Sequence, residues 1–334
     1  MKYSVVLRFS MALCGLILFS CNISAQLKWI NVDSLYQPLP PSVHVYFTDS
    51  PVDTGTFRAY YLIADLKDKD IEFTVDTSKG RRLTPSKFYE KNGKPVVVVN
   101  TTFFSFATNQ NLNVVIKDGK LLGYNIHTIN GRGKDTFTYR HPFGSAIGIS
   151  KKRKADIAWL YADSSMRKPW ASQIQLGPVK DSISQPTFEY LDQKTSVIPI
   201  PHSGKLESWF EKWKMQTAVG GGPVLLQFGK IKITNNEELK FAGKAIDDKH
   251  PRTAMGYTKD GKLIILEVEG RNKNAGGATL TQEAQIFKDL GCQEALNLDG
   301  GGSSCMLVNG KETIKVSDAT GQRPVPAVFI IKQK

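Results

Sequence analysis

The chain has 334 residues, of which 41% are apolar and 22% charged, and its formal net charge is +13. This length and composition support one large hydrophobic core or two modest ones, and they exclude a disordered chain or a repeat protein. A basic protein most often meets anionic surfaces or substrates. Because the lysines are scattered apart from the cluster at residues 151–154, we expect that cluster to be a solvated turn, and we expect no nucleic-acid partner.

The first 25 residues have the pattern of a signal peptide. Lys2 and Arg8 precede an uncharged stretch at residues 9–19 that is too short to span a bilayer. Two processing routes compete, because Ala25 before Gln26 resembles a signal-peptidase site, whereas residues 18–21 resemble a lipoprotein box with a leader to residue 20. We therefore expect an exported protein that is periplasmic, lipid-anchored to the envelope or secreted. Its only expected membrane contact is a lipid on Cys21.

Turn signals recur between β-rich runs along the rest of the chain, which predicts an α+β fold dominated by strands in mixed or antiparallel sheets. Residues 26–90 read as an N-terminal β-rich extension of a core formed by residues 91–334. The strands are expected at residues 43–47, 57–64, 71–75, 96–99, 114–122, 146–149, 157–161, 224–227, 230–234, 252–258, 262–269, 295–299, 306–309 and 327–332. Helical periodicity predicts helices at residues 85–91 behind Thr84, 206–215 behind Ser203 and 279–290.

The segment from Asn297 to Ser303 is the most informative in the chain. A short apolar strand delivers Asn297 and Asp299 into three consecutive glycines, Gly300, Gly301 and Gly302. Such a run adds no side-chain packing and costs ordering entropy, so it indicates a place where a ligand approaches the backbone closely. Ser303 follows the glycines as a turn, a cap or a contact to that ligand.

Two earlier segments have similar features. Gly221 and Gly222 belong to a second glycine triplet before the strand at residues 224–227, and Asn100 ends the apolar strand at residues 96–99. Taken alone, the triplet fits a tight bend, and Asn100 fits the cap of a turn. Two glycine triplets that each adjoin a strand favour backbone that lines a shared cleft.

The strands at residues 252–258 and 262–269 form a hairpin through Asp260-Gly261. Arg252 begins the first strand and Arg271 follows the second, so both guanidinium groups lie at one edge with Glu269 nearby. Arginine suits two-point contact with phosphate or carboxylate. The alternative is a surface Arg–Glu pair, which contributes only about 0.5 kcal/mol.

Gly277 precedes the helix that begins at Thr279, whose sequence fits a capping box. A glycine-bearing loop at a helix N-terminus is a ready site for anions. Glu283 lies in the first turn, where it either complements the helix dipole or supplies a carboxylate to the cleft.

The cysteines outside the leader are Cys292 and Cys305. If residues 294–298 and 305–309 are the arms of a hairpin closed by the glycines, the two thiols are too far apart for a bridge, so we expect two separate buried thiols.

Several catalytic motifs are absent from the sequence, among them a Walker lysine, H-E-x-x-H, C-x-x-C and G-x-S-x-G. The remaining inventory of arginines, carboxylates, an asparagine and glycine backbone suits a sugar, a phosphate or both. We expect no metal and no cofactor.

The motifs together resemble the phosphodiester glycosidases. They are residues 100–104, 221–223, 251–254, 269–271, 277–279 with Glu283, 297–304 and 323–325, in the expected order over about residues 95–332. One departure is Glu269, where the family more often has aspartate. The resemblance implies that residues 91–334 are a catalytic domain that hydrolyses an α-glycosyl phosphodiester, with a GlcNAc-like sugar, at the sugar C1.

The resemblance also implies roles for the candidate residues. Arg252, Arg271 and the helix end at Gly277 and Thr279 would bind the phosphate. Asp299 and Glu269 would serve the oxocarbenium-like transition state, with Glu283 as a third carboxylate. Asn297 and the glycine backbone would hold sugar hydroxyls. Two alternatives stay open: a phosphodiesterase that cleaves P–O, and a non-catalytic envelope protein that binds glycans.

Overall fold

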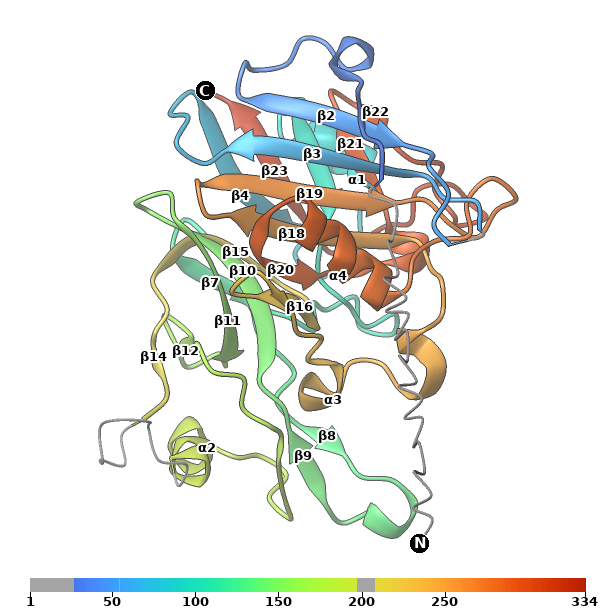
Figure 1. Cartoon of the computed structure of the whole chain (residues 1–334). Coiled ribbons are helices and arrows are strands. Elements are labelled where there is room, and N and C mark those ends of the chain that lie inside the picture. Colours follow the sequence, from blue (N-terminus) through green and yellow to red (C-terminus); the bar gives the residue numbers. More distant parts are fainter. Residues whose placement is uncertain (1–26, 54, 197–207) are drawn as a thin grey trace, which may run out of the picture.

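The computed structural model describes residues 27–53, 55–196 and 208–334. The predicted leader and residues 203–207 lie outside these ranges. Within them the fold is α+β and strands dominate, as the sequence indicates (Figure 1). The strands of every described sheet pair in antiparallel fashion.

The largest sheet of the described residues has eight strands. In spatial order they are β1 (Ile30–Asn31), β2 (Val43–Thr48), β3 (Ala59–Asp65), β19 (Lys262–Val268), β18 (Arg252–Thr258), β20 (Cys292–Asn297), β16 (Val224–Gln227) and β17 (Lys230–Ile231). The β18–β19 hairpin turns at Gly261, whose φ of +92° only glycine adopts readily, and this confirms the turn predicted from Asp-Gly.

Two further sheets pack beside it. A five-stranded sheet has the order β22 (Lys311–Glu312), β21 (Met306–Val308), β5 (Val97–Asn100), β23 (Ala327–Gln333) and β4 (Ile71–Thr77). A seven-stranded sheet has the order β14 (Glu211–Lys212), β12 (Trp170–Ser172), β11 (Ala155–Tyr161), β10 (Gly144–Ser150), β15 (Met215–Gly220), β6 (Val115–Lys117) and β7 (Lys120–Gly123).

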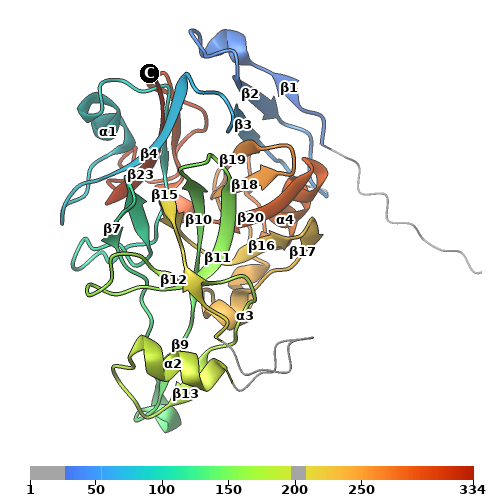
Figure 2. The ribbon, with the colours of Figure 1, turned by 90° about the vertical axis from the view of Figure 1, so that its left-hand side faces the viewer.

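A small sheet of β13 (Val179–Asp181), β9 (Tyr139–His141) and β8 (Ile129–Asn130) projects from this body together with α2 (Phe188–Thr195), at the bottom of Figures 1 and 2.

The described 3-10 helices are η1 (Asp33–Leu35), η2 (Gly133–Asp135), η3 (Gly243–Ile246) and η4 (Gly301–Ser303).

The main core lies between the eight-stranded sheet and the other two large sheets. Val45, Ile147 and Phe329, one from each sheet, belong to this single buried cluster. α4 (Leu280–Asp289) covers the other face of the eight-stranded sheet, and α1 (Pro85–Lys91) covers the outer face of the five-stranded sheet (Figure 2). Alternation along each strand sends one set of side chains into this core and the other toward a helix or solvent.

The predicted helices at residues 85–91 and 279–290 are confirmed, because both begin at a threonine N-cap. Thr84 accepts a hydrogen bond from the Lys87 N–H, and Thr279 forms a complete capping box with Gln282. The prediction of a helix at residues 206–215 is wrong for residues 208–215, the part of it that the structure describes. There β14 pairs with β12 and β15 begins at Met215, and the flanking Phe210 and Trp213 are buried in two different hydrophobic clusters. The sequence analysis did not anticipate α2, nor the short α3 (Asn235–Glu238).

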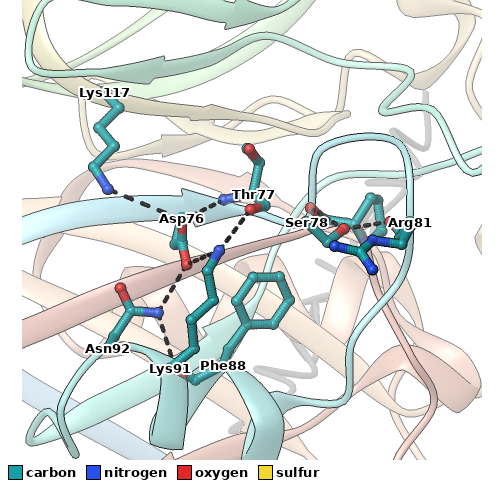
Figure 3. A network of polar contacts seen from close by, with 9 residues as sticks. Asp76, Thr77, Ser78, Arg81, Phe88, Lys91, Asn92 and Lys117 are labelled. Carbon is teal, nitrogen blue, oxygen red and sulfur yellow. Dashed lines mark hydrogen bonds and ion pairs between the residues drawn. The ribbon is translucent and has the colours of Figure 1, made fainter.

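A buried carboxylate attaches α1 to the edge of the five-stranded sheet (Figure 3). Asp76 on β4 accepts from Asn92 Nδ2 at 2.8 Å, pairs with Lys91 Nζ at 2.8 Å, and lies 3.9 Å from Lys117 Nζ. Burial alone would raise the pKa of Asp76, but these hydrogen bonds and charges outweigh it and hold the pKa below its usual value. The network fixes the end of β4 next to β23, the strand that adjoins Asn100.

The hairpin considered for residues 294–298 and 305–309 is wrong, because β20 belongs to the eight-stranded sheet and β21 to the five-stranded one. The glycine segment therefore connects two sheets instead of turning within one. Cys292 and Cys305 are both buried and unbridged, as predicted.

Residues 27–90 supply strands to the eight-stranded and the five-stranded sheet. β3 pairs along the whole of β19, and β4 along the whole of β23. The boundary between an extension and a core at residue 90 stays a prediction. None of the helices in the described residues is both long and apolar enough to span a bilayer.

Candidate functional site

The site is built where the five-stranded and eight-stranded sheets meet. Asn100, fully buried at the end of β5, donates from Nδ2 to the Asp299 carbonyl at 2.5 Å. Its Oδ1 accepts from the Thr253 hydroxyl of β18 at 2.9 Å and from the Cys305 N–H at 3.0 Å. The Asp299 N–H in turn donates to the Thr101 carbonyl at 2.8 Å. Asn100 is therefore a cross-link that fixes the loop carrying Asp299.

Asp299 is half-buried and has the electrostatics of a reactive carboxylate. Burial raises its pKa to about 7, while the Ser303 hydroxyl, the charge of Arg323 and the Gly300 N–H act in the opposite direction. A carboxyl group that titrates near neutral pH can serve as base, nucleophile or acid, and such shifts gather at functional sites.

The glycine triplet accommodates backbone and two guanidinium groups. A Cβ atom on Gly300 would lie 2.8 Å from the Pro251 carbonyl, and one on Gly301 would lie 3.1 Å from Arg271 Nη2. A Cβ atom on Gly302 would overlap the guanidinium of Arg323. Gly300 is required because the Pro251 main chain leaves no room for a Cβ atom, and Gly301 because its φ is +63°, whereas Gly302 lies against the guanidinium group of Arg323.

The second glycine triplet packs directly against the first segment. The Gly222 N–H donates to the Asn297 carbonyl at 2.7 Å, and Asn297 Nδ2 donates to the Gly222 carbonyl at 2.9 Å. A side chain on Gly221 would overlap the Asn297 backbone. The Asn297 Oδ1 atom is buried without a hydrogen-bond partner among the described residues, so it is a free acceptor beside both triplets.

Arg252 lies beneath the site. Its side chain is only 3% exposed, and it donates from Nε to the Ala278 carbonyl at 2.9 Å and from Nη2 to the Asp248 carbonyl at 3.1 Å. Arg271, by contrast, is exposed and contacts His250 Nδ1 at 3.3 Å. Arg271 is thus the more accessible of the two predicted guanidinium groups.

The helix end at Gly277 and Thr279 offers fewer free donors than the loop sequence suggests. Gly277, with φ of +102°, packs against the main chain of His250, and the Ala278 N–H donates to the His250 carbonyl at 3.0 Å. The capping box occupies the N–H groups of Thr279 and Gln282. The glycine here is required mainly by close chain packing.

Two carboxyl groups are fully buried behind the site. Burial raises the pKa of Glu283 to about 8 even though the nearby charge of Arg252 lowers it, and neither oxygen of Glu283 has a hydrogen-bond partner among the described residues. Burial also raises the pKa of Glu267 well above its usual value. The Thr253 hydroxyl lies 3.1 Å from Glu267 Oε1 and 2.9 Å from Asn100 Oδ1, so Glu267 belongs to the same buried polar network as Asn100.

The carboxylate oxygens of Glu269 contact groups outside the predicted set of site residues. They accept from Asn272 Nδ2 and from the Lys315 N–H, both at 3.1 Å, and Arg58 Nε lies 3.7 Å away. None of these contacts is with Asp299, Arg252 or Arg271. The role of Glu269 as the second carboxylate stays a prediction.

The structure adds residues that sequence reasoning did not select. Arg323 begins the motif at residues 323–325, and its Nη1 lies 3.5 Å from the Ser303 hydroxyl. Glu267 could have been selected from the sequence, because it is the single acidic residue in the apolar strand β19. His250 precedes Arg252, and burial followed by the charges of Arg252 and Arg271 lowers its pKa. Because Arg271 can only donate, His250 Nδ1 is the acceptor and the imidazole is neutral.

Lys240 is a further addition with no signal in the sequence. It is half-buried next to Gly222 and lies 5.6 Å from the ring centre of Phe103, and burial lowers its pKa although the charge of Glu238 opposes this. In the part of the chain that the structure describes, no cluster of histidine, cysteine or acidic side chains is arranged to hold a metal ion.

Comparison with known proteins places this site in a family. The family model described as phosphodiester glycosidase matches residues 93–332. An 82-residue stretch is 40% identical to an uncharacterized SPbeta prophage-derived protein of Bacillus subtilis, and an 80-residue stretch is 30% identical to mouse N-acetylglucosamine-1-phosphodiester alpha-N-acetylglucosaminidase. These stretches are 25% and 24% of this chain but only 13% and 15% of those proteins.

Solved structures show the same fold. The zebrafish N-acetylglucosamine-1-phosphodiester alpha-N-acetylglucosaminidase catalytic domain, auto-inhibited by its pro-peptide, superposes with a TM-score of 0.57 at 20% identity over 92% of this chain and 89% of that one. A hypothetical protein from Synechocystis gives 0.56 at 15% identity over 92% of this chain and 68% of that one.

The buried Glu283 predicts a measurable pH dependence of stability. Its pKa in the folded protein is about 8, above the ordinary value of 4.5, so its contribution to stability is complete below pH 4.5 and is lost as the pH rises to about 8. Glu283→Gln stays neutral. We expect the stability of the wild type relative to this variant to fall by about 1 kcal/mol or more between pH 5 and pH 8.5 in urea unfolding. Asp289→Asn, an exposed site on the same helix, is the control, and a parallel pH dependence for Glu283→Gln and wild type would contradict the assignment.

Proposed function

Because the chain belongs to the phosphodiester glycosidase family, we propose that it is an exported hydrolase that cleaves an α-glycosyl phosphodiester at the sugar C1. The products are a free sugar, GlcNAc or one like it, and a phosphomonoester. The observation that carries this proposal is the position of Asp299, a carboxyl group titrating near pH 7 within reach of Ser303 and the charge of Arg323.

The phosphate lies over the glycine triplet in this proposal. Arg271 and Arg323 both reach the triplet, at Gly301 and Gly302 respectively, so a phosphodiester between them contacts two guanidinium groups and the half-buried backbone at Gly301. Arg252 contributes its charge from beneath. A phosphate is a good leaving group because its second pKa is about 6, so it needs charge stabilisation more than a proton, and fixed arginines provide that.

Asp299 acts at C1 on the other side of the scissile bond. Its carboxylate stabilises positive charge as the C1–O bond breaks, or delivers the attacking group, and Asn100 and the Thr101 carbonyl hold its backbone in place. Asn297 is buried and holds the second glycine triplet beside Asp299 through its hydrogen bond to the Gly222 carbonyl, so in this proposal it positions the backbone that the sugar meets.

The position of bond cleavage tests the reaction class. Hydrolysis of an α-GlcNAc-1-phosphoryl diester in heavy-oxygen water should place the label on the sugar, and Asp299→Asn should lower kcat by about 100-fold or more. Label on the phosphate would instead show a phosphodiesterase. Absence of turnover by the wild type on any glycosyl phosphodiester, with binding retained, would show a glycan-binding protein.

The pH profile tests the role of Asp299. An ionised carboxylate at C1 requires kcat/KM to rise with pH through an apparent pKa of about 7. Because the Arg323 charge lowers that pKa, Arg323→Gln should move the rise in kcat/KM to higher pH. Lys311→Gln, an exposed cation, serves as the control for a general charge effect. A flat profile between pH 5 and pH 8 would contradict the assignment.

Export rests on the composition of residues 1–25. Cell fractionation with N-terminal sequencing tests it: lipid anchoring predicts membrane-bound protein that Cys21→Ser releases, and soluble export predicts a mature chain that begins at Gln26. Uncleaved protein in the cytoplasm would contradict both routes.

A further inference from the structure

Arg82 stacks on two aromatic rings, Phe104 and Phe106, next to the candidate site. It lies between β4 and α1, before the residues that the family model matches. Its guanidinium carbon is 5.4 Å from the ring centre of Phe104 and 5.2 Å from that of Phe106, and the two rings are 4.8 Å apart. Stacking on rings uses the faces of a guanidinium group and leaves its N–H edges free.

The donors of Arg82 are unoccupied. Within residues 27–53, 55–196 and 208–334, this half-buried side chain forms neither a hydrogen bond nor an ion pair. Asp318, the acid on the neighbouring loop, is paired with Arg323 at 2.8 Å. A guanidinium group positioned by two rings and lacking a counter-ion is preorganised for an anionic ligand, because little side-chain freedom is left to lose on binding.

Arg323 connects Arg82 and its two rings with the reacting groups. Its guanidinium carbon lies 5.5 Å from the ring centre of Phe106, the same ring that supports Arg82, and its charge acts on Asp299. A ligand whose phosphate contacts Arg323 therefore presents its next few atoms to Phe106, which is 62% exposed, and then to Arg82.

We propose that Arg82, held by Phe104 and Phe106, is a subsite for a second anionic group on the aglycone. The preferred substrates are then glycosyl phosphodiesters whose alcohol part carries a phosphate, phosphonate or carboxylate a few atoms from the reacting phosphate. Phe106 packs against the linker between the two anions. This inference rests on the proposed function for the position of the first phosphate.

Substrate preference tests the subsite. The probes are the methyl and 2-phosphonoethyl diesters of α-GlcNAc-1-phosphate, and the readout is the ratio of their kcat/KM values. We expect the wild type to prefer the phosphonoethyl diester, and Arg82→Ala to lower that preference about 10-fold through KM. Arg82→Lys, which keeps the charge but loses the fork, should give an intermediate ratio.

Arg81→Ala is the matched control, because Arg81 is an exposed neighbour with the same charge. An unchanged ratio in Arg82→Ala, or an equal fall in Arg81→Ala, would overturn the subsite. If the wild type hydrolyses neither diester, the proposed function fails, and calorimetric Kd values for the same two diesters decide the subsite on their own. A Kd ratio that Arg82→Ala does not change, or no binding of either diester, overturns it there as well.

Discussion

The site depends on one buried amide. Asn100 ends the strand β5 of the five-stranded sheet, and its two side-chain atoms hold the Asp299 carbonyl, the Thr253 hydroxyl of the eight-stranded sheet and the Cys305 N–H. An aspartate there could not donate to a carbonyl, and an aliphatic residue would leave the Asp299 carbonyl and the Cys305 N–H without this partner, at a cost of about 1–3 kcal/mol each. The position of Asp299 is thus set by the contact between two sheets and not by the loop alone.

The glycines on either side of this cross-link have a common cause. The loop after β20 passes between the Pro251 backbone and two arginines, and Gly300, Gly301 and Gly302 leave the space that these neighbours fill. The sequence analysis attributed the triplet to a ligand that approaches the backbone. In the structure the guanidinium groups of Arg271 and Arg323 make that approach, and the ligand in our proposal contacts both the arginines and the remaining backbone.

Much of the fold could be predicted from the sequence because strand alternation, the Asp-Gly turn and threonine caps are local signals, and β18, β19, α1 and α4 follow them. The helix predicted at residues 206–215 is wrong in its described part because pairing of β14 with β12 and burial of Phe210 and Trp213 in separate clusters overrode helical spacing. In the site, motif spacing predicted Asp299 and Arg271, and the structure places both at the glycine triplet. Motif spacing could not show that Arg252 and Glu283 are buried, because burial depends on how α4 lies on the sheet.

The buried carboxyl groups determine the net charge that a substrate meets. With a pKa of about 8, Glu283 is mostly neutral at pH 7, and burial raises the pKa of Glu267 in the same direction, which favours its neutral form. Arg252, Arg271 and Arg323 keep their charges, and the acids opposing them at the surface include Asp299, which is only partly ionised, Asp318 and Asp248. Had the two glutamates been ionised, they would have cancelled much of this positive potential. Because burial disfavours their charged forms, Glu267 can contact Thr253 while the surface stays attractive to a phosphodiester anion.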